Sequence, residues 1–155
     1  MTIHREIHLE DEICADLGAA GWLYDPSDAS RYDRTHALYL DDVIAWIKAS
    51  QPQAWAAIEK SQGTAARKVI LERLRKALDA QGTLAVLRSG FELMGLKQAL
   101  SMCQFKPASG INADLLARHA ANRLRVVRQV RYSVHHENSI DLVLFVNGIP
   151  VATAE

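Results

Sequence analysis

The fold is decided by the stretch Asn138-Ser-Ile-Asp-Leu-Val-Leu-Phe-Val-Asn-Gly-Ile-Pro-Val-Ala-Thr-Ala-Glu155. It contains an apolar run, Leu142 to Val146, then Asn147-Gly148, and then a second short run that is largely apolar. An apolar run bounded by turn residues is typical of a buried strand, and Asn-Gly between two such runs is typical of a hairpin turn. The stretch therefore predicts an antiparallel hairpin, with Asp141 at the start of its first strand and Glu155 at the end of its second.

The register of this hairpin decides whether the two carboxylates meet, because side chains alternate between the faces of a sheet. A two-residue loop at Asn147-Gly148 places Asp141 opposite Ala154 and leaves the carboxylates on opposite faces. A three-residue loop places Asp141 across from Glu155, and it puts Pro150 at the first position of a strand, where proline is tolerated. The second version also suits a glycine with positive φ and a bulge, and we favour it. Two facing carboxylates are what a hard cation such as Mg²⁺ requires.

Together with Asn122-Arg-Leu-Arg-Val-Val-Arg-Gln-Val-Arg-Tyr-Ser133, the hairpin resembles the amino-terminal nuclease domain of the R (restriction) subunit of type I restriction enzymes. That domain belongs to the PD-(D/E)xK nuclease superfamily, whose motif is an aspartate, a hairpin and then Glu-x-Lys. Asp141 and Glu155 match the first two positions. Because the chain stops at Glu155, we expect the lysine and the last helix and strand of the fold to be missing from it. The resemblance covers nearly the whole chain and is strongest from Phe105 onward.

The resemblance implies an α/β fold with a restriction-endonuclease-like core. We expect a mixed, mainly antiparallel sheet of three to five strands, flanked by helices, with a helical insertion after the first helix. The chain would be the N-terminal part of a single nuclease domain. Residues 1–20 would form the first core helix, 36–81 the insertion, and 83–155 the sheet with the catalytic hairpin. The strand at 142–145 is apolar on both faces, so it must be covered on both sides.

The activity implied by the resemblance is Mg²⁺-dependent cleavage of double-stranded DNA within a type I restriction-modification complex. Asp141 and Glu155 would be catalytic and would hold the metal. The first helix of such nucleases also carries a glutamate that helps to hold metal, for which Glu10 is the best match and Glu6 the second. The partners would be DNA and the modification and specificity subunits. ATP would be used only by motor domains absent from this chain, since it has no Gly-rich loop ending in Gly-Lys-Ser/Thr.

A second hypothesis is not enzymatic. Without the lysine of the motif, the chain would be a catalytically incomplete fragment that contacts DNA or docks onto partner subunits. A nuclease requires that lysine, whereas a binding or docking module does not.

The distribution of charge agrees with a DNA-facing surface. The net charge is zero, but residues 1–60 hold 5 Lys/Arg against 11 Asp/Glu, whereas residues 61–155 hold 13 against 7. A basic half that also carries the acidic pair suits a protein that binds DNA around a metal site, although ordinary solvated surface charge explains the same numbers. Within this half we predict DNA contacts for Arg123, Arg125 and Arg131.

Other features predict a cytoplasmic protein that does not enter a membrane. No amino-terminal signal pattern is present, and no apolar run approaches the roughly 20 residues of a membrane span. Cys14 and Cys103 lie far apart in mostly apolar surroundings, so we interpret them as reduced core residues.

Periodicity outlines the remaining elements. It predicts helices at Thr2–Leu17, Leu38–Ile47, Thr64–Ala80 and Ala113–Ala121, a further segment that begins at Pro52, and strands at Thr83–Leu87 and Leu124–Tyr132. Residues 88–103 stay open between strand and helix. Arg128 falls on the apolar face of its strand with Val126 and Val130, and an unpaired guanidinium there is costly. We therefore expect a carboxylate partner, a bulge or a sheet edge at Arg128, with a structural ion-pair role.

Overall fold

A computed structural model describes residues 2–155, with side chains from His4 onward, and gives a mixed α/β fold. The chain forms two compact units. One unit comprises the residues up to Tyr39 together with Arg123–Glu155, and the second comprises Leu40–Asn122. No helix within residues 2–155 combines the length and the apolar character needed to cross a membrane.

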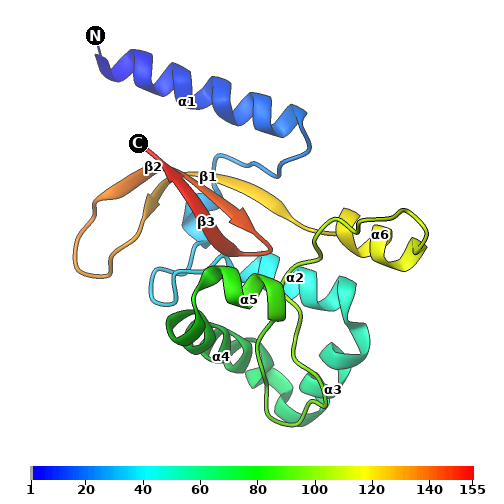
Figure 1. Ribbon diagram of the computed structural model, residues 1–155. Helices are drawn as coiled ribbons and strands as arrows, with labels where there is room; N and C mark the ends of the chain where they lie inside the picture. Colours follow the sequence, from blue (N-terminus) through cyan, green and yellow to red (C-terminus); the bar gives the residue numbers. More distant parts are fainter. Residues whose placement is uncertain (1) are drawn as a thin grey trace. The chain divides into compact units, whose positions relative to one another are not determined.

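The first unit pairs one long helix with a small antiparallel sheet (Figure 1). The strands follow the order β1-β2-β3, with β2 in the centre. A single parallel bridge between Leu23 and Arg125 adds the segment after the helix to the edge at β1. The elements of this unit are α1 (Thr2–Ala19), the 3₁₀ helix η1 (Asp28–Arg31), β1 (Leu124–Arg131), β2 (Ser139–Val146) and β3 (Ile149–Ala154).

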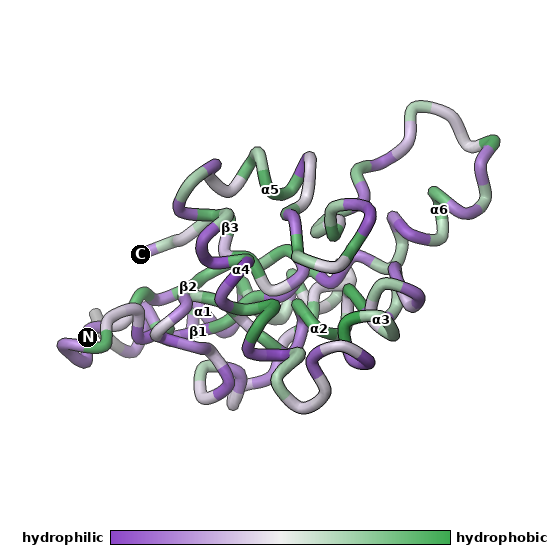
Figure 2. Tube along the Cα trace, turned by 90° about the horizontal axis from the view of Figure 1, so that it is seen from below, coloured by the Kyte–Doolittle hydropathy of each residue, from purple (hydrophilic) through white to green (hydrophobic). Residues whose placement is uncertain are grey.

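The second unit is helical, and hydrophobic and hydrophilic residues alternate along its helices (Figure 2). The predicted boundaries are confirmed at Pro52, which begins α3, at Gly82, which ends α4 with a φ of +85°, and at Asn112, whose side chain caps α6. Trp46 is fully buried, as predicted for a packing residue. The elements are α2 (Leu40–Ser50), α3 (Pro52–Gln62), the 3₁₀ helix η2 (Gly63–Ala65), α4 (Ala66–Gln81), α5 (Thr83–Ser89) and α6 (Ala113–Ala120).

The strand predicted at Thr83–Leu87 is wrong, because these residues form the helix α5. Two glycines delimit it: the Val86 amide donates to Gly82 O at 3.2 Å, and the Gly90 amide donates to Val86 O at 2.7 Å. A strand needs a neighbour for its backbone groups, whereas a helix satisfies them locally, so the β-branched residues did not decide the outcome. After α5, the ambiguous segment contributes only an isolated bridge between Phe91 and Leu100.

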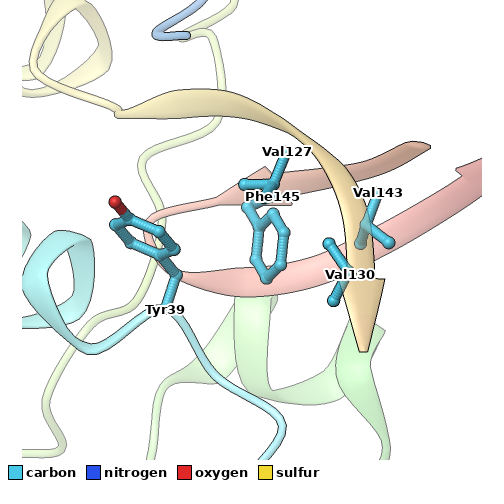
Figure 3. Packing of buried hydrophobic residues seen from close by; sticks show 5 residues of the cluster. All are labelled: Tyr39, Val127, Val130, Val143 and Phe145. Carbon is cyan, nitrogen blue, oxygen red and sulfur yellow. The ribbon is translucent and has the colours of Figure 1, made fainter. Parts of the chain in front are cut away.

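Both faces of the sheet are covered, as the apolar β2 requires. On one face, Cys14 of α1 packs with Val126 and Leu142. On the other, Phe145 packs with Tyr39 and with valines of β1 and β2, as Figure 3 shows. Strict alternation predicts Val130 on the face of Val126, but Val130 lies in the Phe145 cluster.

The hairpin turn between β2 and β3 contains two residues, not the three that we favoured. Val146 pairs with Ile149, and Asn147 and Gly148 have φ values of +49° and +84°, the left-handed conformation that tight hairpin turns use. Asn147 is fully buried, and its Oδ1 accepts a hydrogen bond of 2.7 Å from the Arg123 amide. This bond ties the turn to the start of β1.

A bulge in β3 restores the register that the three-residue loop would have produced. Phe145 pairs with Pro150, but Leu144 pairs with Ala152, so Val151 is the extra residue. Beyond the bulge, Leu142 pairs with Ala154. The next step of this register sets Glu155 opposite Asp141. Extrapolated by one residue, this register agrees with the predicted juxtaposition of the two acids, but it arises from a tight turn and a bulge.

Candidate active site

The site begins with a local distortion of β1. Arg128 pairs with Leu142 and Val130 with Ile140, but Gln129, which lies between them and opposite Asp141, has a φ of +51°. A left-handed conformation costs an L-residue roughly 1–2 kcal/mol. It also interrupts the alternation of side chains, which explains why Val130 changes face.

The side-chain amide of Gln129 brings two carboxylates together. Its Nε2 lies 3.2 Å from Asp141 Oδ1 and 3.4 Å from each carboxylate oxygen of Glu10. Its Oε1 accepts a hydrogen bond of 2.7 Å from Ser139 Oγ, which determines the orientation of the amide. An amide has two N–H donors, enough for one bond to each carboxylate. The amide thus links the first helix to the start of β2.

Glu10 is buried, at 8% exposure, and Arg128 neutralises it. Arg128 Nε and Nη2 donate to Glu10 Oε2 at 3.0 and 2.8 Å, and Nη1 contacts Asp11 Oδ1. Burial opposes the charge on Arg128, but its hydrogen bonds to Glu10 and Tyr24 and the charges of the two acids outweigh this effect, so the pKa of the guanidinium is raised. The predicted structural ion pair of Arg128 is thereby confirmed.

The predicted site residues differ in their surroundings. Glu10 and Asp141 meet at Gln129, whereas Glu155 is exposed and is related to Asp141 only through the register of the hairpin. Glu6 lies on the exposed side of α1. Among the side chains from His4 to Glu155, no three of the types His, Cys, Asp and Glu are grouped so that they could hold a metal ion.

The three arginines predicted to contact DNA also differ. Arg125 is largely enclosed, with 11% of its side chain exposed, and its Nη1 donates to the buried Asp28 at 2.8 Å. Asp28 also accepts a hydrogen bond of 2.9 Å from the Tyr39 hydroxyl, and the Arg125 guanidinium lies 4.6 Å from the centroid of that ring. The structure thus gives Arg125 a packing role. Arg123 is partly buried, and Arg131 is 60% exposed.

Sequence reasoning missed Gln129 and Ser139 as site residues. The alternation of β1 separates Gln129 from Arg128, and the positive φ that lets both side chains reach Glu10 has no signature in the composition of the strand. The available signal was register, because Gln129 lies opposite Asp141 once β1 and β2 are paired. Asp28 was also missed, since it lies in a polar segment that predicts an exposed loop.

The family model that describes the N terminus of type I restriction enzyme R proteins matches residues 5–155. It therefore includes α1 from its first turn, the helical unit and the whole hairpin. No curated protein matches the chain significantly, and neither does any solved structure.

Proposed function

This chain belongs to the family of type I restriction enzyme R protein N termini, and we propose that it cleaves double-stranded DNA in a Mg²⁺-dependent reaction. The family places the chain in a type I restriction system that acts on DNA. The cleavage itself would be carried out with Asp141 and Glu155 as catalytic metal ligands and Glu10 as a third ligand. The modification and specificity subunits of the complex would be its partners.

One observation carries this proposal: Asp141 and Glu10 come from distant parts of the chain and converge on one amide. Two carboxylates that approach the same small group repel each other unless a cation or donors lie between them. Here the Gln129 amide supplies the donors, and Arg128 compensates the charge of Glu10 through Oε2, whereas Glu10 Oε1 has a weaker contact of 3.4 Å to Gln129. Such an oxygen-only donor set suits Mg²⁺ in its chemistry.

The residues of the chain would then have separate tasks. Asp141 and Glu155 would provide ligands from adjacent strands, and Gln129 would position Asp141 against Glu10. Mg²⁺, when bound, would polarise the phosphate and lower the pKa of the attacking water. The family motif places a lysine two residues after its glutamate, which is beyond Glu155 in this chain. That lysine would orient the water and offset developing charge.

The first experiment is a calorimetric titration of the chain with Mg²⁺ and Mn²⁺. We expect wild type and the control Asp114→Asn, an exposed acid of the helical unit, to bind equally. Asp141→Asn should weaken binding by more than about tenfold, since even residues behind the ligands contribute that much. Equal binding by Asp141→Asn would contradict the assignment of this residue.

A nuclease assay separates the two hypotheses about activity. It compares this chain with a version extended through the lysine that the motif expects, on supercoiled plasmid DNA with Mg²⁺. Nicking by the extended protein that Asp141→Asn abolishes would support the enzyme. Absence of metal binding at either length would make the carboxylates structural, and the DNA-contacting or subunit-docking module would then be the better hypothesis.

A further inference from the structure

A cleft of about 500 Å³ opens beside the carboxylate cluster, within the same unit. Gln129 and Ser139, which hydrogen-bond to each other next to Asp141, contribute to its lining. Arg34 and Arg131 also line it, together with Glu137 from the turn that joins β1 to β2. The cleft is therefore basic on balance and adjoins the site that would hold the metal.

Glu137 lies between the two arginines. Arg34 Nη1 is 3.2 Å from its Oε1, and Arg131 Nη1 is 2.7 Å from its Oε2. Each oxygen of one carboxylate is thus held by a different guanidinium. The Glu137 side chain is 66% exposed, so water competes with both ion pairs, and such pairs contribute at most about 1 kcal/mol each.

The two arginines are not equally free to move. Arg34 is 29% exposed, and it donates through Nε to Ser133 O at 2.9 Å and through Nη2 to His136 O at 2.8 Å. These bonds fix its guanidinium against the backbone of the turn. Arg131, which is 60% exposed, forms an ion pair with Glu137, which is itself exposed. The Arg34 guanidinium is therefore preorganised, whereas the Arg131 side chain can adjust its position to a ligand.

We propose that Arg34 and Arg131 form a clamp for a backbone phosphate of DNA, and that Glu137 occupies the clamp when DNA is absent. A phosphodiester, like a carboxylate, offers two oxygens that share one negative charge, and guanidinium groups bind both in the same way. When the phosphate takes the place of the Glu137 carboxylate, two weak ion pairs are replaced and the carboxylate is released into water. The choice of DNA as the ligand rests on the proposed function.

The position of the clamp explains what it would contribute. A phosphate held by Arg34 and Arg131 would share the cleft with Gln129 and Ser139, the residues that contact Asp141 or one another. The clamp would thus hold the strand beside the carboxylates, while Glu137 screens the arginines from other anions. It acts as a positioning device and needs no metal.

The test is fluorescence anisotropy with a labelled DNA duplex, in buffer that contains EDTA, over a series of salt concentrations. Glu137→Gln should bind DNA up to about fivefold more tightly than wild type, the amount that corresponds to a competing exposed ion pair. Arg131→Gln should bind more weakly and should reduce the slope of log K against log[salt] by about one. Arg88→Gln, an exposed arginine of the helical unit, is the matched control and should leave the slope unchanged.

Several outcomes would overturn the clamp. They are a wild-type protein that binds no DNA at low salt, an unchanged or weakened affinity in Glu137→Gln, or a slope that changes as much in Arg88→Gln as in Arg131→Gln. Arg131→Lys gives a second check, because it keeps the charge and loses the planar fork, so it should retain the slope and lose affinity. The assay excludes metal, so its result is independent of the Mg²⁺ titration, and failure of one proposal can be told from failure of the other.

Discussion

Replacing Arg128 by methionine should destabilise the sheet unit strongly. The Arg128 guanidinium joins β1 to α1 through Glu10 and Asp11, and methionine retains much of the apolar length of the side chain without the charge. Glu10, at 8% exposure, would then lose the guanidinium that compensates its charge and would keep the long contacts to Gln129. The loss should therefore come mainly from an uncompensated carboxylate, and not from a cavity.

The exposure of the pair sets the magnitude. Removing one partner of a buried ion pair costs about 3–5 kcal/mol, whereas an exposed pair is worth at most about 1 kcal/mol. The side chains of Arg128 and Glu10 are 21% and 11% exposed, so the pair lies between these limits and nearer to the buried one. We expect the free energy of unfolding to fall by about 2–3 kcal/mol, or the melting temperature by about 5–10 °C for a chain of this size.

Urea denaturation followed by circular dichroism would measure this loss, with Arg131→Met as the matched control. The Arg131 pair with Glu137 is exposed on both sides, so the control should lose less than about 1 kcal/mol. A double-mutant cycle with Glu10→Gln should give a coupling energy of at least about 1 kcal/mol, because the double variant leaves no buried charge. A loss in Arg128→Met no larger than in the control, or additive effects in the cycle, would show that Glu10 does not depend on Arg128 for compensation of its charge.

Three further predictions concern other parts of the structure. Gln129→Gly should change the free energy of unfolding by less than about 1 kcal/mol in urea denaturation, because relief of the backbone strain at φ +51° offsets the lost hydrogen bonds. The same variant should weaken Mg²⁺ binding in calorimetry, and an unchanged Mg²⁺ affinity would count against a positioning role for Gln129. Asn147→Ala should cost about 2–4 kcal/mol, because it removes the acceptor of the Arg123 amide and places alanine at φ +49°, and Asn147→Gly should lose less in the same measurement. Burial raises the pKa of the Cys14 thiol, so alkylation at pH 8 followed by mass spectrometry should modify Cys14 slowly in the native protein and rapidly in denaturant; equal rates would contradict its burial.

Patterns that are complete within a short stretch could be predicted from the sequence. Each of three such signals depends on a few neighbouring residues, and the structure confirms all three: Asn112 caps α6, Pro52 begins α3, and Asn147-Gly148 forms the hairpin turn. The α1 helix follows from its own periodicity for the same reason. In these places local chemistry and tertiary packing favour the same conformation.

Features that depend on distant partners could not be predicted in this way. Helix α5 contains β-branched residues, which are typical of strands, yet it is a helix whose backbone hydrogen bonds are local. The φ of Gln129 depends on Glu10 and Asp141, which lie in other elements. The need of Arg128 for a carboxylate was predictable from burial, but the identity of that carboxylate was not. The acids Glu10 and Asp141 of the candidate site were thus named from the sequence, whereas the Gln129 amide that joins them was not.

The bulge at Val151 has a consequence for how this hairpin can change in evolution. A regular ladder from the same turn would pair Val151 with Leu144 and would set Asp141 opposite Ala154, so the extra residue brings Glu155 into phase with Asp141. Deletion of Val151 would remove the bulge and would leave Ala152 opposite Leu144, which keeps the two acids in phase. Loss of the bulge with all residues retained would instead put Glu155 one step out of phase, although every acidic side chain would still be present in the sequence. Deletion of Val151, which is 40% exposed, should therefore preserve the alignment of the two acids better than a change that flattens the bulge. In this hairpin, the phase of the acids depends on whether the bulge forms, and not only on which residues are present.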